Sequence, residues 1–101
     1  MKDNVVKDKS LEFAVRIVNL YKFLVNEQKE FVMSKQILRS GTSIGANIRE
    51  AEQAQSRADF INKLNIALKE ANETEYWLEL DRKSTRLNSS HTDSSRMPSS
   101  A

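Results

Sequence analysis

The chain has no cysteine, two glycines and one proline among its 101 residues. The absence of cysteine excludes a disulfide framework and thiol catalysis, and it removes the commonest ligand of structural zinc. The scarcity of glycine and proline argues against a chain built of many β-turns. Long apolar runs are also absent, so no membrane-spanning helix is predicted. The N-terminus, Met1–Asn4, lacks the apolar core of a signal peptide, and we therefore expect a cytoplasmic protein.

The charge of the chain is unevenly divided. Hydrophobic residues make up 39% and charged residues 30%, a balance typical of a soluble globular helical protein. The formal net charge is +2, but residues 1–81 carry 12 basic and 13 acidic side chains, whereas residues 82–101 carry 4 basic and 1 acidic. Because residues 1–81 are nearly neutral, overall charge gives no support for nucleic-acid binding.

The composition changes after Asp81. Residues 82–101 contain seven serines and two threonines and follow no helical or strand period, which predicts a disordered tail. Two origins are open for this segment. It is either a natural flexible tail or a translated adapter or vector sequence, which the run Arg82–His91 resembles. We favour the second origin, which implies that the natural protein is longer and that this chain is truncated.

Apolar residues at helical spacing predict three helices, at about residues 8–26, 34–54 and 57–81, within one domain of residues 1–81. The first helix is apolar on more than one face. Ser34 is the predicted cap of the second helix, and Ser56 with Asp59 forms a capping-box-like start of the third. The predicted apolar stripe of the third helix comprises Phe60, Leu64, Ala67, Leu68, Ala71 and Leu78.

The middle of the second helix, Ser40–Asn47, resembles a loop because it contains two glycines. Gly41 and Gly45 are nevertheless four residues apart, on one face, where small residues let two helices approach closely. We therefore predict a continuous helix, with a break near Gly41 as the alternative. Short connections between the helices predict an all-α, up-down antiparallel bundle, with three helices present of an expected four.

A polar series follows one face of the second helix. Its members are Gln36, Arg39, Ser43, Asn47 and Glu50. This face is either solvated or part of a hydrogen-bonded network in which Arg39 pairs with Glu70 or Glu73 of the third helix. Local chemistry leaves both interpretations open.

Catalytic signals are weak in this sequence. Glu50, Glu52, Glu70 and Glu73 resemble part of the Mg²⁺ site of all-α nucleotide pyrophosphohydrolases, but a full acidic quartet is absent. The glycine segment lacks the Lys-Ser/Thr of a phosphate-binding loop. The single histidine, His91, lies in the tail, which excludes a hydrolase triad. We predict no catalytic residue, no metal site and no cofactor.

Two sets of residues are candidates for binding. Ile66, Tyr76 and Trp77 form a second apolar surface of the third helix, which either covers a fourth helix or serves as a subunit interface. The candidate phosphate contacts are scattered along the chain. They are Lys22, Lys29, Lys35, Arg49, Arg57 and Lys63.

The segment Gln36–Ala51 resembles the signature of the four-helix bundle family encoded by 23S rRNA intervening sequences, of the form Q-x-x-R-x-x-x-S-I-x-x-N-I-x-E. Phe60–Leu80 resembles the family's third helix, and the resemblance covers about residues 8–81. It implies an antiparallel four-helix bundle and a ring of protomers, a pentamer. Related proteins are accessory subunits of diversity-generating retroelements, in which a basic ring engages reverse transcriptase and nucleic acid.

The resemblance also bears on the polar series. The family's recurrent polar residues fall on Gln36, Arg39, Ser43, Asn47, Glu50 and Glu73, which implies a structural network. The sequence thus predicts a non-enzymatic, self-associating scaffold that is associated with RNA or a ribonucleoprotein and not with a membrane. The alternatives are a protein-binding adaptor bundle and a Mg²⁺-dependent nucleotide pyrophosphohydrolase.

Overall fold

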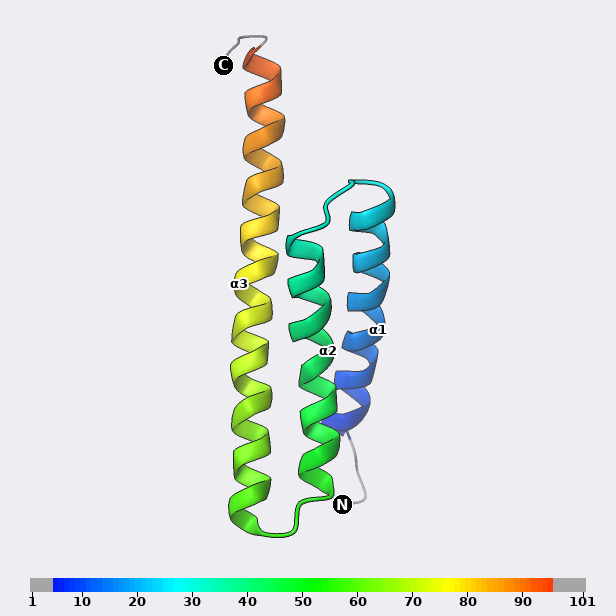
Figure 1. Ribbon diagram of the computed structural model, residues 1–101, viewed down its shortest axis with the longest axis vertical. Helices are drawn as coiled ribbons and strands as arrows, with labels where there is room; N and C mark the ends of the chain where they lie inside the picture. The colour runs from blue at the N-terminus through cyan, green and yellow to red at the C-terminus, as the bar shows by residue number, and fades with distance from the viewer. Residues whose placement is uncertain (1–4, 96–101) are drawn as a thin grey trace.

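A computed structural model describes the backbone of residues 5–95 and the side chains of residues 5–85. The described residues form three helices and no strand: α1 (Val5–Asn26), α2 (Met33–Glu52) and α3 (Arg57–Ser95). The helices run alternately up and down, with α2 between α1 and α3 (Figure 1). The predicted all-α, up-down bundle is therefore confirmed for these three helices.

The three helices form an open arrangement. Both α1 and α3 pack against α2, but over the described residues no Cα atoms of α1 and α3 come within 8 Å of one another. The buried centre is small and consists of Ile17, Leu24 and Ile37. Partly buried side chains surround it from all three helices: Phe13, Leu20, Leu38, Trp77 and Leu78. A fourth helix, which the sequence led us to expect, is not among the described elements.

Close approach of α1 to α2 depends on the small residues of α2. A Cβ atom added at Gly41 would lie 2.8 Å from Cγ1 of Ile17, so only glycine fits there without movement. At Gly45 the nearest atom to an added Cβ is Oγ of Ser10, at 3.4 Å, an ordinary contact distance. The glycine segment thus lies inside a packed helix and not in a loop.

Helix α2 is continuous through this segment, and the alternative break does not occur. Hydroxyl groups are satisfied within the helix, because Ser40, Thr42 and Ser43 donate to backbone carbonyls one turn earlier, at 2.9, 2.7 and 2.7 Å. Serine and threonine usually favour loops because their hydroxyl groups compete with the helix for backbone hydrogen bonds. Here the hydroxyl groups bond within α2, so the helix is kept.

The start of α2 differs from the prediction. Ser34 is not its cap: it lies in the first turn, is fully buried, and its Oγ has no hydrogen-bond partner. The cap is the carboxylate of Glu30, which accepts from the backbone N–H groups of Val32, Met33 and Ser34 at 3.2, 2.9 and 2.6 Å. A carboxylate reaches several free N–H groups at the positive end of the helix, which one hydroxyl cannot do.

Helix α3 begins as predicted, with Oγ of Ser56 accepting from the N–H of Asp59 at 3.0 Å. The described backbone of α3 continues past Asp81 to Ser95, and the disordered tail expected for residues 82–101 stays a prediction. Residues 82–95 contain no glycine or proline, and extending an existing helix is much easier than nucleating one. The rest of the predicted tail lies outside the described residues.

Candidate interaction sites on α2 and α3

A buried hydroxyl pair joins the middle of α2 to α3. Ser40 and Thr74 are both essentially inaccessible, and Oγ1 of Thr74 lies 2.8 Å from Oγ of Ser40. Each hydroxyl also reaches a carbonyl of its own helix, those of Gln36 and Glu70, at 2.9 and 2.7 Å. Two hydroxyl protons therefore have three acceptors, and both groups remain satisfied. Thr74 was overlooked in the sequence, although it lies on the same face as Ala67 and Leu78.

An ion-pair cluster lies beside this hydroxyl pair. Arg39 of α2 donates to Glu70, at 3.3 Å, and to Glu73, both on α3. Glu73 also accepts from Nε1 of Trp77 at 3.0 Å. The Glu70 side chain is 14% exposed and that of Arg39 is 50% exposed, so the cluster lies at the edge of the interface. The structure thus places Arg39 against both carboxylates that the sequence offered as partners.

The other members of the polar series do not join this cluster. Ser43 donates to the carbonyl of Arg39 and Asn47 to the carbonyl of Ser43, at 2.7 and 2.9 Å, so both bond within α2. Glu50 pairs with Lys63 at 2.9 Å and raises the pKa of that ammonium group. Gln36 is half-buried and takes part through its backbone carbonyl. The series therefore divides into one cross-helix cluster and several local bonds.

The candidate apolar surface of Ile66, Tyr76 and Trp77 is not uniform. Ile66 is half-buried, and Tyr76 is 58% exposed. Trp77 packs against the buried centre and meets the Tyr76 ring edge-on, with centroids 5.2 Å apart. Of the three residues, only Tyr76 offers a largely exposed ring.

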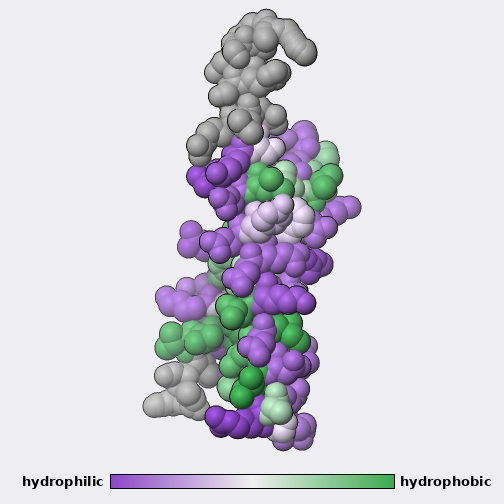
Figure 2. All heavy atoms as spheres, turned by 90° about the vertical axis from the view of Figure 1, so that its left-hand side faces the viewer, coloured by the Kyte–Doolittle hydropathy of each residue, from purple (hydrophilic) through white to green (hydrophobic). Residues whose placement is uncertain are grey.

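A larger exposed apolar surface lies on α3, where the sequence had predicted burial. Leu64 and Leu68 of the predicted stripe are 36% and 61% exposed, and their neighbour Ile61 is 44% exposed. Figure 2, viewed from the α3 side, shows hydrophobic surface gathered in its lower half, towards the start of α3. Helix α3 packs mainly along α2, and Trp77 and Leu78 reach the buried centre. The described part of the chain provides no second helix to cover Ile61, Leu64 and Leu68.

The candidate phosphate contacts do not form one patch. Lys22, Lys29 and Lys35 lie at the end of the molecule where α1 meets α2. Arg49, Arg57 and Lys63 lie at the opposite end, and Lys63 is engaged by Glu50. The two groups of basic residues are thus separated by about the length of α2.

The candidate Mg²⁺ ligands are each paired with a cation. Glu70 and Glu73 contact Arg39, Glu50 contacts Lys63, and Glu52 lies 3.6 Å from Lys7. Within the part of the chain that the structure describes, no three acidic, histidine or cysteine side chains are grouped to hold a metal ion. The same part contains no helix long and apolar enough to span a membrane.

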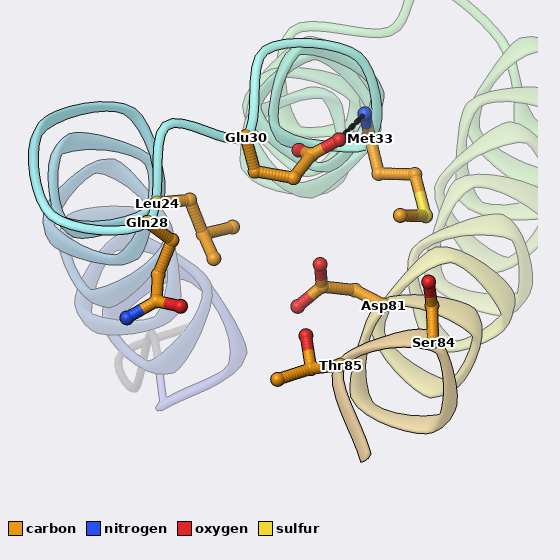
Figure 3. A pocket seen from close by; sticks show the side chains of 7 residues that line it. All are labelled: Leu24, Gln28, Glu30, Met33, Asp81, Ser84 and Thr85. Carbon is orange, nitrogen blue, oxygen red and sulfur yellow. Dashed lines mark hydrogen bonds between the residues drawn. The ribbon is translucent and has the colours of Figure 1, made fainter. Parts of the chain in front are cut away.

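A hollow lies where the α1–α2 connection meets α3 (Figure 3). It has a volume of about 200 Å³ and is lined by Leu24, Gln28, Glu30, Met33, Asp81, Ser84 and Thr85. Burial and the nearby Glu30 carboxylate raise the pKa of Asp81. Sequence patterns gave no sign of this hollow, because its two carboxylates are far apart in the chain.

Comparisons with known proteins agree with the helical fold. A family model described as 23S rRNA-intervening sequence protein matches residues 2–97. This match runs past the predicted boundary at residue 81, and the adapter origin of the tail stays a prediction. No curated protein matches the chain.

A solved structure is also similar to this chain. It is a protein of unknown function from the S23 ribosomal protein family of Bacteroides thetaiotaomicron VPI-5482. The sequence identity is 95% and the TM-score 0.81, over 83% of this chain and 75% of that chain.

Proposed function

The chain belongs to the 23S rRNA-intervening sequence protein family, and on this basis and from its exposed apolar faces we propose that it is a non-enzymatic scaffold that acts by self-association. The exposed apolar residues of α1 and α3 carry the proposal. Large exposed apolar patches are typical of interaction surfaces, because a single copy gains stability when it covers them. On α1 these residues are Val5, Val6, Leu11, Val15 and Phe23, and on α3 they are Phe60, Ile61, Leu64, Leu68, Tyr76 and Leu80.

A structural role also accounts for the polar residues. The Arg39 cluster and the Ser40–Thr74 pair join α2 to α3 and fix how the two helices align. Such contacts add specificity more than stability, since each replaces hydrogen bonds to water. Every carboxylate that resembles a catalytic ligand is engaged by a cation, which supports a scaffold over a phosphohydrolase.

The mass of the protein in solution tests the proposal. Sedimentation velocity over a series of protein concentrations is expected to show an assembly of two or more copies. A ring, which the family resemblance implies, gives one discrete mass, and five copies identify a pentamer. A protein that remains a single copy at every concentration contradicts self-association and favours the adaptor, which binds a different protein.

Association with RNA is a second proposal, and it has less support from the molecule. The family description and the ribosomal family of the solved relative favour it. Among the candidate phosphate contacts, the exposed Lys22, Lys29 and Lys35 come closest to forming a cluster of positive charge. Binding of a 23S rRNA fragment is expected to weaken steeply with salt if these residues contact phosphates. Binding that is absent, or unchanged in a Lys22→Glu, Lys29→Glu, Lys35→Glu variant, contradicts this proposal.

A further inference from the structure

The connection between α1 and α2 places an aromatic ring in water. Phe31 is 53% exposed, and its neighbour Val32 is 73% exposed. Both residues lie between the end of α1 and the start of α2, at one end of the molecule and not along a helix face (Figure 1). A single exposed apolar residue is common on protein surfaces, so the surroundings of Phe31 decide whether it has a use.

Phe31 is not needed to start α2. Val32 occupies the N-cap position, and an apolar residue before the cap often packs on the fourth residue of the helix, which here is the polar Gln36. The first N–H groups of α2 are instead satisfied by the carboxylate of Glu30, which Figure 3 shows turned towards Met33. Among the described residues, Phe31 is also not one of those packed around the buried centre.

Positive charge surrounds the exposed ring. Three exposed lysines lie at the same end of the molecule, and none of them makes an ion pair with the side chains of residues 5–85. They are Lys22, Lys29 and Lys35. Glu30 and Asp81 are half-buried around the hollow, which leaves Glu27 as the exposed carboxylate of residues 22–35. Phe31 therefore lies among cations that have not been neutralised.

An exposed ring beside several cations matches the chemistry of an unpaired nucleotide. The flat face of a base stacks on an aromatic side chain, and the phosphates on either side of that base attract lysines. A double helix keeps its bases stacked on one another, so a ring at its surface reaches no base face. A protein partner would also cover Phe31, but RNA supplies a negative charge with every nucleotide.

We propose that Phe31 stacks on an unpaired base of single-stranded RNA, with Lys29 and Lys35 contacting the phosphates that flank this base. The inference rests on the proposed association with RNA, and it names the form of the RNA and the residue that holds it. The lysines alone would bind any nucleic acid, whereas the ring selects bases that are not paired.

Fluorescence anisotropy with a labelled oligouridine of about 12 nucleotides, measured over a range of salt concentrations, tests the stacking. Phe31→Ala is expected to weaken binding about tenfold without changing the salt dependence, because stacking is not electrostatic. Lys29→Gln together with Lys35→Gln is expected to reduce the slope of log affinity against log salt by about 0.7 for each lysine.

Two matched variants separate the ring from the connection that carries it. Phe31→Tyr keeps an aromatic ring and is expected to retain binding. Val32→Ala removes the neighbouring exposed side chain, which has no ring to stack, and is expected to leave the affinity unchanged. With an RNA duplex of the same length, Phe31→Ala and the unchanged protein should bind equally well, because the bases of a duplex are not accessible to the ring.

The outcomes distinguish this inference from the proposed RNA association. Binding of a 23S rRNA fragment without binding of the oligouridine overturns the single-strand contact and leaves RNA association intact. The same holds if Phe31→Ala binds the oligouridine as tightly as the unchanged protein does. Equal losses in Phe31→Tyr and Val32→Ala would assign the effect to the shape of the connection and overturn stacking. An unchanged protein that binds neither RNA overturns both proposals.

Discussion

At Gly41 the α2 backbone comes so close to Ile17 that a single methyl group decides whether the two helices fit. Gly41→Ala places a Cβ atom 2.8 and 2.9 Å from two carbons of the buried Ile17 side chain. The resulting displacement outweighs the gain in helix propensity, and we expect a net loss of about 1–2 kcal/mol of stability in chemical denaturation.

Gly45→Ala is the matched control for that substitution. Its added Cβ lies 3.4 Å from the nearest atom, so the gain in helix propensity remains and stability is expected to rise by about 0.5–1 kcal/mol. Equal effects of the two substitutions would contradict the close approach at Gly41.

Arg39 has two carboxylate partners, one of them nearly buried. Arg39→Met leaves Glu70, whose side chain is 14% exposed, without its cation, and we expect a loss of about 1 kcal/mol in denaturant unfolding. Lys63→Met is the comparison, because its partner Glu50 is 59% exposed and stays hydrated, so the loss should be smaller. A larger loss for Lys63→Met would show that burial of the acceptor is not the deciding factor.

At the scale of elements, the connection between α1 and α2 holds the least expected contact. Lys29 has a left-handed backbone, with φ of 55°, and it turns the chain so that the next residue, Glu30, reaches the start of α2. Glu30→Ala removes the acceptor of three backbone N–H groups, and we expect a loss of about 1–2 kcal/mol in thermal or chemical unfolding.

A second measurement separates capping from a general loss of structure. Glu30 is one cause of the raised pKa of Asp81, so an NMR titration of Glu30→Ala is expected to show that pKa moving down towards its usual value. Glu27→Ala, an exposed neighbour, is the control and should change neither stability nor the titration. An unchanged pKa of Asp81 would mean that the two carboxylates do not interact.

Sequence patterns were sufficient for the elements but not for their ends. The spacing of apolar residues predicted all three helices, and Ser56 marked the start of α3 because its signal is local. The cap of α2 was missed because Glu30 acts from within the connection, outside the usual cap position. The predicted end of α3 near residue 81 depended on the serine-rich composition that follows, which says little about a helix that has already formed.

At the scale of the whole molecule, the difficulty was to know which apolar residues are covered. Arg39 and its carboxylates were predictable, because their helix faces follow from spacing alone. Leu64 and Leu68 were assigned to the core for the same reason, yet they are exposed, because burial depends on which other helices are present. A helical period identifies an apolar face but not its neighbour.

The open arrangement of the three helices therefore predicts that stability depends on protein concentration. If only folded copies associate, the melting temperature rises with protein concentration, because association shifts the folding equilibrium towards the folded state. Leu68→Glu places a charge on the most exposed of the large apolar residues of α3 and should abolish this rise. At the lowest concentration the variant and the unchanged protein should melt together, because Leu68 is already 61% exposed in one copy. A melting temperature of the unchanged protein that is independent of concentration would contradict assembly, and a variant that melts lower at every concentration would assign Leu68 to the core of a single copy.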